Sequence, residues 1–239
     1  MEAIVLAGGL GTRLAARLSG VPKPMAPVAG RPFLEILLNQ LERAGCARVV
    51  LSVGHLHAAI QNHFGAVFRG MRVDYAIESA PLGTGGAIRA ALNEVTEGSV
   101  LALNGDTFLD ADYASMMRFH HVESAGLTMA ITHRNDVARY GGVIVRNGRG
   151  ETRANSRIVG FEEKGRSGPG WINAGAYIID RNMRWPVNLP EKFSFETDFL
   201  TPEIARLAPA AYEVNGFFLD IGVPEDLDRA QTELCAFLP

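Results

Sequence analysis

Positively charged side chains beside a glycine-rich turn are the first sign of chemistry in this sequence. Gly8, Gly9 and Gly11 follow a short apolar run. Arg13 comes two residues later, and Lys23 lies between two prolines. Glycines let backbone N–H groups approach an anion without interference from a Cβ atom, and the two cations add full positive charges. The pattern favours a cradle for phosphate groups, although a glycine-rich turn alone is also typical of an ordinary tight turn.

The turn differs from two well-known phosphate-binding loops. It has neither the G-x-G-x-x-G pattern of dinucleotide-binding proteins nor the G-K-[ST] end of a Walker A loop. Pro22 and Pro24 hold Lys23 on a stiff, non-helical segment, because proline fixes its own φ angle and biases the residue before it towards extended backbone. The helical pattern at 14–18 predicts a helix whose N-terminus adds roughly half a positive charge.

Two carboxylates stand where apolar strands are predicted to end. Asp106 comes after the run 100–103, and Asp220 comes directly after Phe218 and Leu219. Mg²⁺ prefers one or two carboxylates together with phosphate oxygens and waters. An acid at an apolar strand end is costly unless it is paired or bound to metal. Both residues are therefore predicted metal ligands, with a turn or a helix cap as the alternative for Asp106.

A second glycine-rich stretch, 78–86, begins with Glu78 and contains Gly83 and Thr84. Its glycines would let a base and ribose approach closely. An ionised Glu78 can only accept hydrogen bonds. Guanine presents N1–H and N2–H₂ as adjacent donors on one edge, whereas uracil and thymine present one imide N–H between two carbonyls. The residue type therefore favours GTP, with a solvated Glu78 as the alternative.

Apolar strands alternate with amphipathic helices in the first half of the chain. Strands are expected at 4–6, 48–53, 72–77, 100–103 and 127–132, and helices at 33–41, 55–64, 86–92 and 112–121. This alternation predicts a parallel sheet covered on both faces. Right-handed crossovers bring the turns that follow the strands to one edge. The glycine turn, Glu78 and Asp106 should share that edge.

The second half predicts a smaller lobe that returns to the main sheet. Strands are expected at 142–145, 158–163 and 174–179, and helices at 198–207 and 224–237. The predicted fold class is α/β, a Rossmann-like, mostly parallel sheet flanked by helices, with a smaller mixed β lobe that binds the sugar. We expect one domain over 1–239, with a nucleotide-binding half at about 1–135 and the sugar-binding lobe at about 136–239.

Charge and composition exclude some classes of binding partner. The 239 residues have a net charge of −3, which gives no basic surface for nucleic acid. No signal peptide and no apolar run near 18 residues is present, so no membrane partner and a cytoplasmic location are expected. Cys46 and Cys235 are expected to be buried free thiols, His120 and His121 to lie on a helix surface, and Asp226 and Asp228 to be exposed acids. Whether the chain forms a homo-oligomer stays open.

The stretch Leu6-Ala7-Gly8-Gly9-x-Gly11-Thr12-Arg13-Leu14, followed by Pro22-Lys23-Pro24-Met25, resembles the signature of the sugar-phosphate nucleotidyltransferases. These enzymes join a nucleoside triphosphate to a sugar 1-phosphate and release pyrophosphate. The resemblance extends to about Asp226 and is strongest to the D-glycero-D-manno-heptose 1-phosphate guanylyltransferases. It implies GTP and a heptose 1-phosphate as substrates, Mg²⁺ as cofactor, and a GDP-sugar for surface polysaccharide synthesis as product.

Three later motifs resemble the sugar-binding side of the family: Tyr140-Gly141-Gly142-Val143, Phe161-Glu162-Glu163-Lys164 and Trp171-Ile172-Asn173-Ala174-Gly175. The resemblance assigns nucleotide binding to Leu6, Ala7, Gly8, Gly9, Gly11, Thr12, Arg13, Glu78, Gly83, Thr84 and Asp106. It assigns sugar-phosphate binding to Lys23, Gly141, Glu163, Lys164 and Asn173, metal binding to Asp106 and Asp220, and catalysis to Arg13, Lys23, Asp106 and Asp220. Gly165 departs from the proline that often follows the family's lysine, and a charged hairpin is the alternative for 161–164.

Three other functions compete with this prediction. A uridylyl- or thymidylyltransferase would act on another hexose 1-phosphate. A non-catalytic regulatory module would be expected to lack the arginine, the lysine or the metal aspartates, and all four are present. A glycosyltransferase would use an Asp-x-Asp pair, and Asp110-Ala111-Asp112 has that spacing, but it lies where a helix should start.

Overall fold

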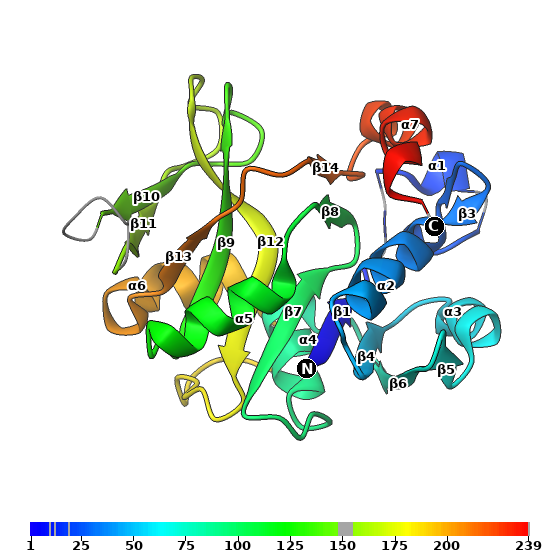
Figure 1. Ribbon diagram of the computed structural model, residues 1–239, viewed down its shortest axis with the longest axis horizontal. Helices are drawn as coiled ribbons and strands as arrows, with labels where there is room; N and C mark the ends of the chain where they lie inside the picture. Colours follow the sequence, from blue (N-terminus) through cyan, green and yellow to red (C-terminus); the bar gives the residue numbers. More distant parts are fainter. Residues whose placement is uncertain (10, 12, 19, 148–154, 239) are drawn as a thin grey trace.

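A computed structural model describes residues 1–9, 11, 13–18, 20–147 and 155–238. In this part of the chain, ten strands form one sheet in the order β10-β11-β13-β9-β12-β7-β1-β4-β6-β5 (Figure 1). They are β1 (Glu2–Leu6), β4 (Arg48–Val53), β5 (Val67–Phe68), β6 (Met71–Ile77), β7 (Ser99–Asn104), β9 (Leu127–Arg134), β10 (Val143–Arg146), β11 (Arg157–Phe161), β12 (Gly170–Asp180) and β13 (Ala210–Glu213). Two short pairs lie outside it, β2 (Pro27–Val28) with β3 (Arg31–Pro32) and β8 (Thr107–Leu109) with β14 (Phe218–Asp220).

Helices cover both faces of the sheet. One face carries α2 (Phe33–Arg43), α3 (His57–Phe64), α5 (Tyr113–Val122) and α7 (Pro224–Glu233). The other carries α4 (Gly83–Ala91), η2 (Phe195–Leu200) and α6 (Thr201–Leu207). Figure 1 looks onto the face with α2 and α5. Ala3 and Val5 of β1 lie in the first hydrophobic core and Ile4 lies in the second, because neighbouring side chains of a strand point to opposite faces.

The parallel part of the sheet brings the predicted site residues to one edge. Strands β7, β1, β4 and β6 run parallel, and Leu6 at the end of β1 pairs with Ser52 and Asn104. The turns after β1, β6 and β7 therefore start at the same level of the sheet. Glu78 follows β6 directly, and Asp106 lies two residues beyond the end of β7. The predicted common edge is confirmed.

The second half of the chain extends this sheet and makes it mixed. Strand β12 runs antiparallel to both β7 and β9 and separates them, and β9 is parallel only to β13. We expected 127–132 to continue the parallel series, and the structure places β12 in that position instead. The lobe predicted from the second half is thus continuous with the nucleotide-side sheet through β12.

Short elements account for most of the differences from the sequence prediction. Strands β2, β3, β5, β8 and β13 have two to four residues each, too few to show a periodic pattern. Helix α1 (Ala15–Leu18) has four residues, so the charge expected at its N-terminus is small. Helix α4 begins at Gly83 rather than near Gly86. Two short 3-10 helices complete the description: η1 (Lys23–Met25), which begins with Lys23, and η3 (Cys235–Phe237), near the C-terminus.

The structure contradicts the predictions made for His120 and Cys235. His120 is buried, with its Nδ1 at 2.8 Å from Thr128 Oγ1 and its Nε2 at 3.1 Å from Asp180 Oδ1. The periodicity of the sequence could not show that the folded chain places these two polar partners next to His120. Cys235 is exposed, whereas Cys46 is buried as expected. None of the helices in the described part of the chain has the length and apolar composition needed to span a bilayer.

A buried charge network fixes the start of β1 and with it the glycine turn. Glu2 accepts hydrogen bonds from Arg48 of β4 and from the backbone N–H groups of Thr96 and Glu97. Burial would raise the pKa of Glu2, but these hydrogen bonds outweigh it and lower the pKa to about 2. The carboxylate therefore stays ionised and joins β1 to its neighbour and to the segment before β7.

Candidate active site

A cavity of about 280 Å³ lies at the edge of the sheet where β1, β6 and β7 end. The turns that follow all three strands contribute to its wall. The lining residues are Leu6, Gly8, Gly9, Lys23, Pro24, Glu78, Pro81, Gly83, Thr84, Ala87, Asn104, Gly105, Asp106 and Lys192. The structure thus brings together predicted site residues that are far apart in the sequence.

A smaller cavity of about 160 Å³ adjoins the first and shares Gly9, Lys23 and Asp106 with it. Its lining adds Gly11, Leu14, Gly222 and the exposed residue Arg13. Within the described residues, no hydrogen bond or ion pair restrains the Arg13 side chain. Ala7 is buried beneath the turn, with its N–H donating to Ser52 O at 2.7 Å. Thr12, predicted to bind nucleotide, lies outside the described residues.

The glycines of the turn make room for side chains of the site. A Cβ atom at Gly8 would lie 2.4 Å from Glu78 Oε1, and one at Gly11 would lie 2.9 Å from Lys23 Cβ. Gly11 also has a φ of +58°, which favours glycine. Gly9 lines both cavities and has no described atom within 4 Å of the position that a Cβ would take. The backbone at Gly9 is therefore open to a ligand.

Lys23 and Asp106 form an ion pair between the two cavities. Lys23 Nζ donates to Asp106 Oδ2 at 2.5 Å, with the lysine side chain 10% exposed and the aspartate side chain 36% exposed. Lys23 begins η1, a short 3-10 helix after Pro22, so the prediction of a non-helical segment is wrong. Pro24 is compatible with this turn because proline is tolerated at the first positions of a helix. The charge is fixed beside the glycine turn, as the sequence suggested.

The strand pair β8–β14 holds Asp220 beside Asp106. Asp220 pairs with Thr107 in this two-stranded ladder, and the N–H of Ile221 donates to Asp106 O at 2.9 Å. Burial raises the pKa of the Asp220 carboxyl, and the neighbouring negative charge of Asp106 raises it further. A divalent cation beside the two carboxylates would relieve both effects on Asp220. The residues present therefore suit Mg²⁺.

Hydrogen bonds from Ser52 and Leu82 hold the Glu78 carboxylate, and its oxygens can still accept further hydrogen bonds. Ser52 Oγ donates to Glu78 Oε1 at 3.0 Å, and the N–H of Leu82 donates to Oε2 at 3.0 Å. A carboxylate has about four acceptor positions, so each oxygen can accept another hydrogen bond. The side chain lies in the cavity wall with a fixed orientation, which a freely solvated glutamate would lack.

The glycines after Glu78 lie against the segment 191–193, and Gly83 also lines the larger cavity. A Cβ atom would lie 2.6 Å from Phe193 O at Gly83, 2.2 Å from the Phe193 ring at Gly85, and 2.4 Å from Glu191 O at Gly86. The sequence interpretation, that these glycines let a base and ribose come close, is therefore incomplete. Their small size lets α4 pack against the segment before η2. Thr84 joins the same contact, since its Oγ1 accepts from the N–H of Phe195 at 2.9 Å.

Lys192 is a cavity residue that the sequence analysis missed. It lies between Glu191 and Phe193, the residues packed against α4, and lines the larger cavity with Lys23 and Asp106. Its side chain makes no ion pair with the described residues, so its charge is available to an anion. No motif surrounds Lys192, and only the packing of 191–193 on α4 brings it to the site.

Of the predicted sugar-phosphate-binding residues, Lys23 lines both cavities, whereas Gly141, Glu163, Lys164 and Asn173 lie apart from their linings. Glu163 and Lys164 are exposed in a turn after β11, and a Cβ atom at Gly141 (φ +83°) would lie 3.5 Å from Lys164 Cγ. Asn173 Nδ2 donates to Tyr177 Oη at 2.6 Å, and its Oδ1 accepts from the N–H of Gly175. Both donors of Asn173 Nδ2 are thus used within the protein, by Tyr177 and Glu196, whereas Oδ1 keeps a second acceptor position.

The N-x-G motif reaches the cavity through a neighbour. A Cβ atom at Gly175 (φ +72°) would lie 2.7 Å from Asn104 Nδ2, and Asn104 lines the larger cavity. The hydrogen bond from Gly175 to Asn173 shapes β12 at this point. The motif therefore supports the wall of the site from behind, a role that the sequence alone did not indicate.

Two acids of the last helix behave differently. Asp228 is exposed as predicted and pairs with Arg17 of α1 at 3.0 Å. Asp226 is buried, which contradicts the prediction, and it accepts hydrogen bonds from Arg139 and Arg229. Sequence reasoning failed here because Arg139 comes from a distant segment, and the local i,i+3 pair with Arg229 gives no sign of burial. Asp112 caps α5 by accepting from the N–H of Ser115 at 2.8 Å, in agreement with the helix start expected there.

Comparison with known proteins identifies the family. Residues 2–236 match the protein family described as nucleotidyl transferase. The chain belongs to this family. The resemblance read from the glycine turn and the Pro-Lys-Pro segment is thereby confirmed, and the α/β fold expected from the sequence is the fold of solved members.

Individual members of the nucleotidyl transferase family are similar over nearly the whole chain. D-glycero-alpha-D-manno-heptose 1-phosphate guanylyltransferase from Aneurinibacillus thermoaerophilus is 42% identical, over 98% of this chain and 98% of its own. The protein of the same name from Campylobacter jejuni is 38% identical, over 95% and 96%. HddC from Yersinia pseudotuberculosis, solved in complex with GMP-PN, is 34% identical with a TM-score of 0.82, over 98% of this chain and 99% of its own.

Proposed function

We propose that this protein joins GTP to D-glycero-D-manno-heptose 1-phosphate and releases pyrophosphate. The observation that carries the proposal is the cavity in which Glu78, Lys23 and Asp106 meet. It combines an oriented acceptor for a base with a fixed cation and a carboxylate for phosphates and metal. Two relatives that share 42% and 38% identity with the chain carry this activity in their names, which supports the same choice of substrates.

The reaction is an in-line displacement at phosphorus. An oxygen of the sugar 1-phosphate forms a bond to the α-phosphorus of GTP, and the bond from that phosphorus to the bridging oxygen of the β-phosphate breaks. Pyrophosphate leaves with the electron pair, and GDP-sugar remains. Because the nucleophile is already an anion, no general base is required.

Electrostatic repulsion between the two substrates is the main obstacle. A pair of unit charges about 4 Å apart repels by roughly 4 kcal/mol at an effective dielectric of about 20, and several such pairs meet here. Lys23, Arg13 and Lys192 supply positive charge around the cavities, and the backbone N–H groups near Gly9 add partial charges. These residues bring the polyanions together and hold them for reaction.

Asp106 and Asp220 are the residues that would hold Mg²⁺. The cation would neutralise phosphate charge and withdraw electrons from the α-phosphoryl group. Lys23 is paired with Asp106 in this structure and would face the phosphates once the carboxylate is shared with the cation. The assignment of Mg²⁺ rests on the preference of this ion for carboxylate and phosphate oxygens.

Glu78 is proposed to select guanine. Its two oxygens are anchored by Ser52 and Leu82, and the side chain lies in the cavity wall. Guanine N1–H and N2–H₂ can both donate to such a carboxylate, and hydrogen bonds to a charged group contribute about 1.5–3 kcal/mol. A pyrimidine with carbonyls at both sides of its N–H would be repelled.

The sugar would bind on the side of the lobe at about 136–239, with Gly141, Glu163, Lys164 and Asn173 as its proposed contacts. Glu163 and Lys164 are exposed and free of ion pairs with the described residues, so both can reach a ligand. Gly141 has no side chain, so no Cβ atom covers the backbone beside Lys164. The GDP-sugar product would serve as an activated donor in the cytoplasm for surface polysaccharide synthesis.

A substrate grid tests the proposal. Purified protein is incubated with Mg²⁺ and each combination of GTP, UTP, dTTP and ATP with heptose, mannose and glucose 1-phosphates, and pyrophosphate and nucleotide-sugar are measured. We expect GTP with the heptose 1-phosphate to give the highest kcat/KM. A preference for UTP or dTTP would replace the proposal with a uridylyl- or thymidylyltransferase, and no pyrophosphate from any pair would indicate a non-catalytic module.

A further inference from the structure

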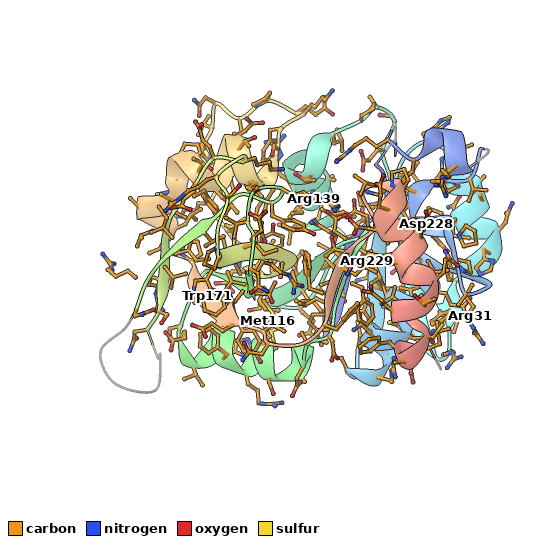
Figure 2. All side chains as sticks on the ribbon, turned by 90° about the horizontal axis from the view of Figure 1, so that it is seen from above. Arg31, Met116, Arg139, Trp171, Asp228 and Arg229 are labelled. Atoms are coloured by element: carbon orange, nitrogen blue, oxygen red, sulfur yellow. The ribbon has the colours of Figure 1, made fainter. Side chains whose placement is uncertain are left out.

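Arg139 lies where three segments meet beside the metal-binding aspartates. Its Nη1 donates to Asp226 in the first turn of α7, and its Nη2 lies 3.7 Å from Asp220 Oδ2 in β14. Its guanidinium also lies 5.2 Å from the centre of the Tyr140 ring. Figure 2 shows Arg139 beside α7, the helix that also carries Asp228 and Arg229. One side chain thus connects the sugar-side segment, the last helix and a metal ligand.

Asp226 fixes the position of Arg139. The Asp226 side chain is 6% exposed and accepts hydrogen bonds from both Arg139 and Arg229. A buried carboxylate must be paired, because burial of an isolated charge is strongly unfavourable. Arg229 is held in turn by Glu233 of the same helix. Arg139 is therefore anchored from behind by a charge that has no other function in the proposed reaction.

The two oxygens of Asp220 have different neighbours. Oδ1 accepts from the N–H of Gly222 at 2.6 Å, whereas Oδ2 faces Arg139 at 3.7 Å. A separation of 3.7 Å is an ion contact rather than a hydrogen bond. Arg139 thus orients Oδ2 by charge and leaves its lone pairs free for a cation.

The strand that carries Asp220 needs this support. Strand β14 has three residues and pairs only with the three-residue β8 in the described structure. Arg134 Nη2 donates to Phe218 O at 3.1 Å, and the Tyr140 ring packs on the Phe218 ring with centroids 5.6 Å apart. Side chains from 134–140 therefore hold both ends of β14, Phe218 through Arg134 and Tyr140, and Asp220 through Arg139.

We propose that Arg139 is a positioning residue that aims Asp220 at the divalent cation and couples the sugar-side segment to the metal site. The inference rests on the proposed function, which assigns Asp220 as a ligand of the cation that accompanies GTP. Gly141, two residues after Arg139, is a proposed sugar-phosphate contact. A shift of the Tyr140-Gly141 backbone on sugar binding would move the guanidinium that orients Asp220.

The test measures how much Mg²⁺ improves GTP binding. The ratio of the Kd of a fluorescent GTP derivative in EDTA to its Kd in Mg²⁺ is measured for the wild type, Arg139→Met, Arg139→Lys, Asp226→Asn and Arg229→Met. Arg229→Met is the matched control, because Arg229 also contacts Asp226 but not Asp220. Thermal unfolding of each variant reports its stability separately.

We expect Arg139→Met to reduce the ratio about tenfold or more, the usual effect of removing a partner of a metal ligand. Arg139→Lys should recover part of the lost ratio, since lysine restores the positive charge but not the planar, two-pronged geometry of the guanidinium. Asp226→Asn should also reduce the ratio, and it decides the question if Arg139→Met does not fold. Arg229→Met should keep the ratio within about twofold even if its Tm falls.

An unchanged ratio in Arg139→Met and Asp226→Asn, with only a lower Tm, would show that the arginine is merely structural and would overturn the inference. A wild type with no gain from Mg²⁺ would overturn it as well. If the wild type binds GTP but forms no GDP-sugar, the proposed function fails while this comparison still decides the role of Arg139. Should GTP not bind, the same variants are compared with Mn²⁺ alone by EPR.

Discussion

Lys23 and Asp106 are joined by an ion pair at 2.5 Å in the wall shared by both cavities. The two residues are separated by most of the first half of the chain and meet because the turns after β1 and β7 share one edge of the sheet. In the proposed reaction Lys23 binds the phosphates and Asp106 binds the cation. The pair thus keeps both charges oriented until the substrates replace it.

Replacing Lys23 by methionine should abolish most of the activity. The substitution keeps the stem that packs against Gly11 and removes the charge that offsets phosphate repulsion. We expect kcat/KM to fall by at least about 10², in line with the loss of one preorganised charge. Pyrophosphate release is measured on variant protein shown to be folded by circular dichroism. Near-wild-type turnover would show that Lys23 does not contact the reacting phosphates.

Replacing Asp106 by asparagine should impair metal use. Asparagine fills the same space but leaves Lys23 without its counter-charge and the cation without one of its two carboxylates. We expect at least about a 10² loss of kcat/KM and a higher Mg²⁺ concentration for half-maximal rate. Asp110→Asn is a control, because that acid lies outside the linings of both cavities. An unchanged Mg²⁺ requirement in Asp106→Asn would refute the metal role.

Glu78→Gln should weaken the selection of guanine while keeping the shape of the site. Glutamine retains one acceptor and loses the charge, so the loss of kcat/KM for GTP should be about 10- to 100-fold, the equivalent of a charged hydrogen bond. ITP lacks the 2-amino group and should be the poorer substrate of the wild type, by a margin that shrinks in the variant. Equal use of GTP and ITP by the wild type would argue against this contact.

The site shows how far sequence reasoning extends. The glycine turn, Glu78 and Asp106 were predictable because each follows a strong apolar strand, and parallel strands bring their carboxyl ends to one edge. Lys23 was predicted from the two prolines beside it. Lys192 was not, because packing of 191–193 on α4 rather than a local pattern brings it to the cavity. Asn104 ends β7 at the same edge, but the sequence analysis assigned no role to it. The glycines at 83–86 were noted for the right reason, close approach, but they approach 191–193 as well as the cavity.

The fold shows the same limit. Alternation of strands and helices predicted β1, β4, β6 and β7 with their order of appearance, since each is a buried apolar run. It could not predict that β12 would enter the sheet antiparallel between β7 and β9, because the apolar pattern of a strand does not determine the direction in which the strand runs. The burial of Asp226 and His120 depended on partners supplied by distant segments, Arg139 and Asp180.

His120 predicts a pH dependence of stability. Burial lowers the pKa of His120, against a raising effect of its hydrogen bond to Asp180. The folded protein therefore keeps the ring neutral, while the unfolded chain takes up a proton as the pH falls through about 6.5. Stability from this group is present above that pH and is lost as the pH falls, by up to about 1.4 kcal/mol per pH unit.

Urea unfolding of the wild type and His120→Gln between pH 5 and 8 checks this expectation. The variant has no titrating ring, so the difference between the two free energies of unfolding should shrink as the pH falls from 7 to 5.5. A difference that stays constant over this range would show that His120 is protonated equally in the folded and unfolded states.

The central claim is that two polyanions meet where Lys23, Arg13 and the Asp106–Asp220 pair surround the glycine turn. A crystal structure of the protein with Mg²⁺ and a non-hydrolysable GTP analogue tests it most directly. The account predicts the triphosphate on the backbone of 8–13, the cation between Asp106 and Asp220, and the guanine edge against Glu78. Phosphates bound away from Lys23 and Arg13 would contradict it.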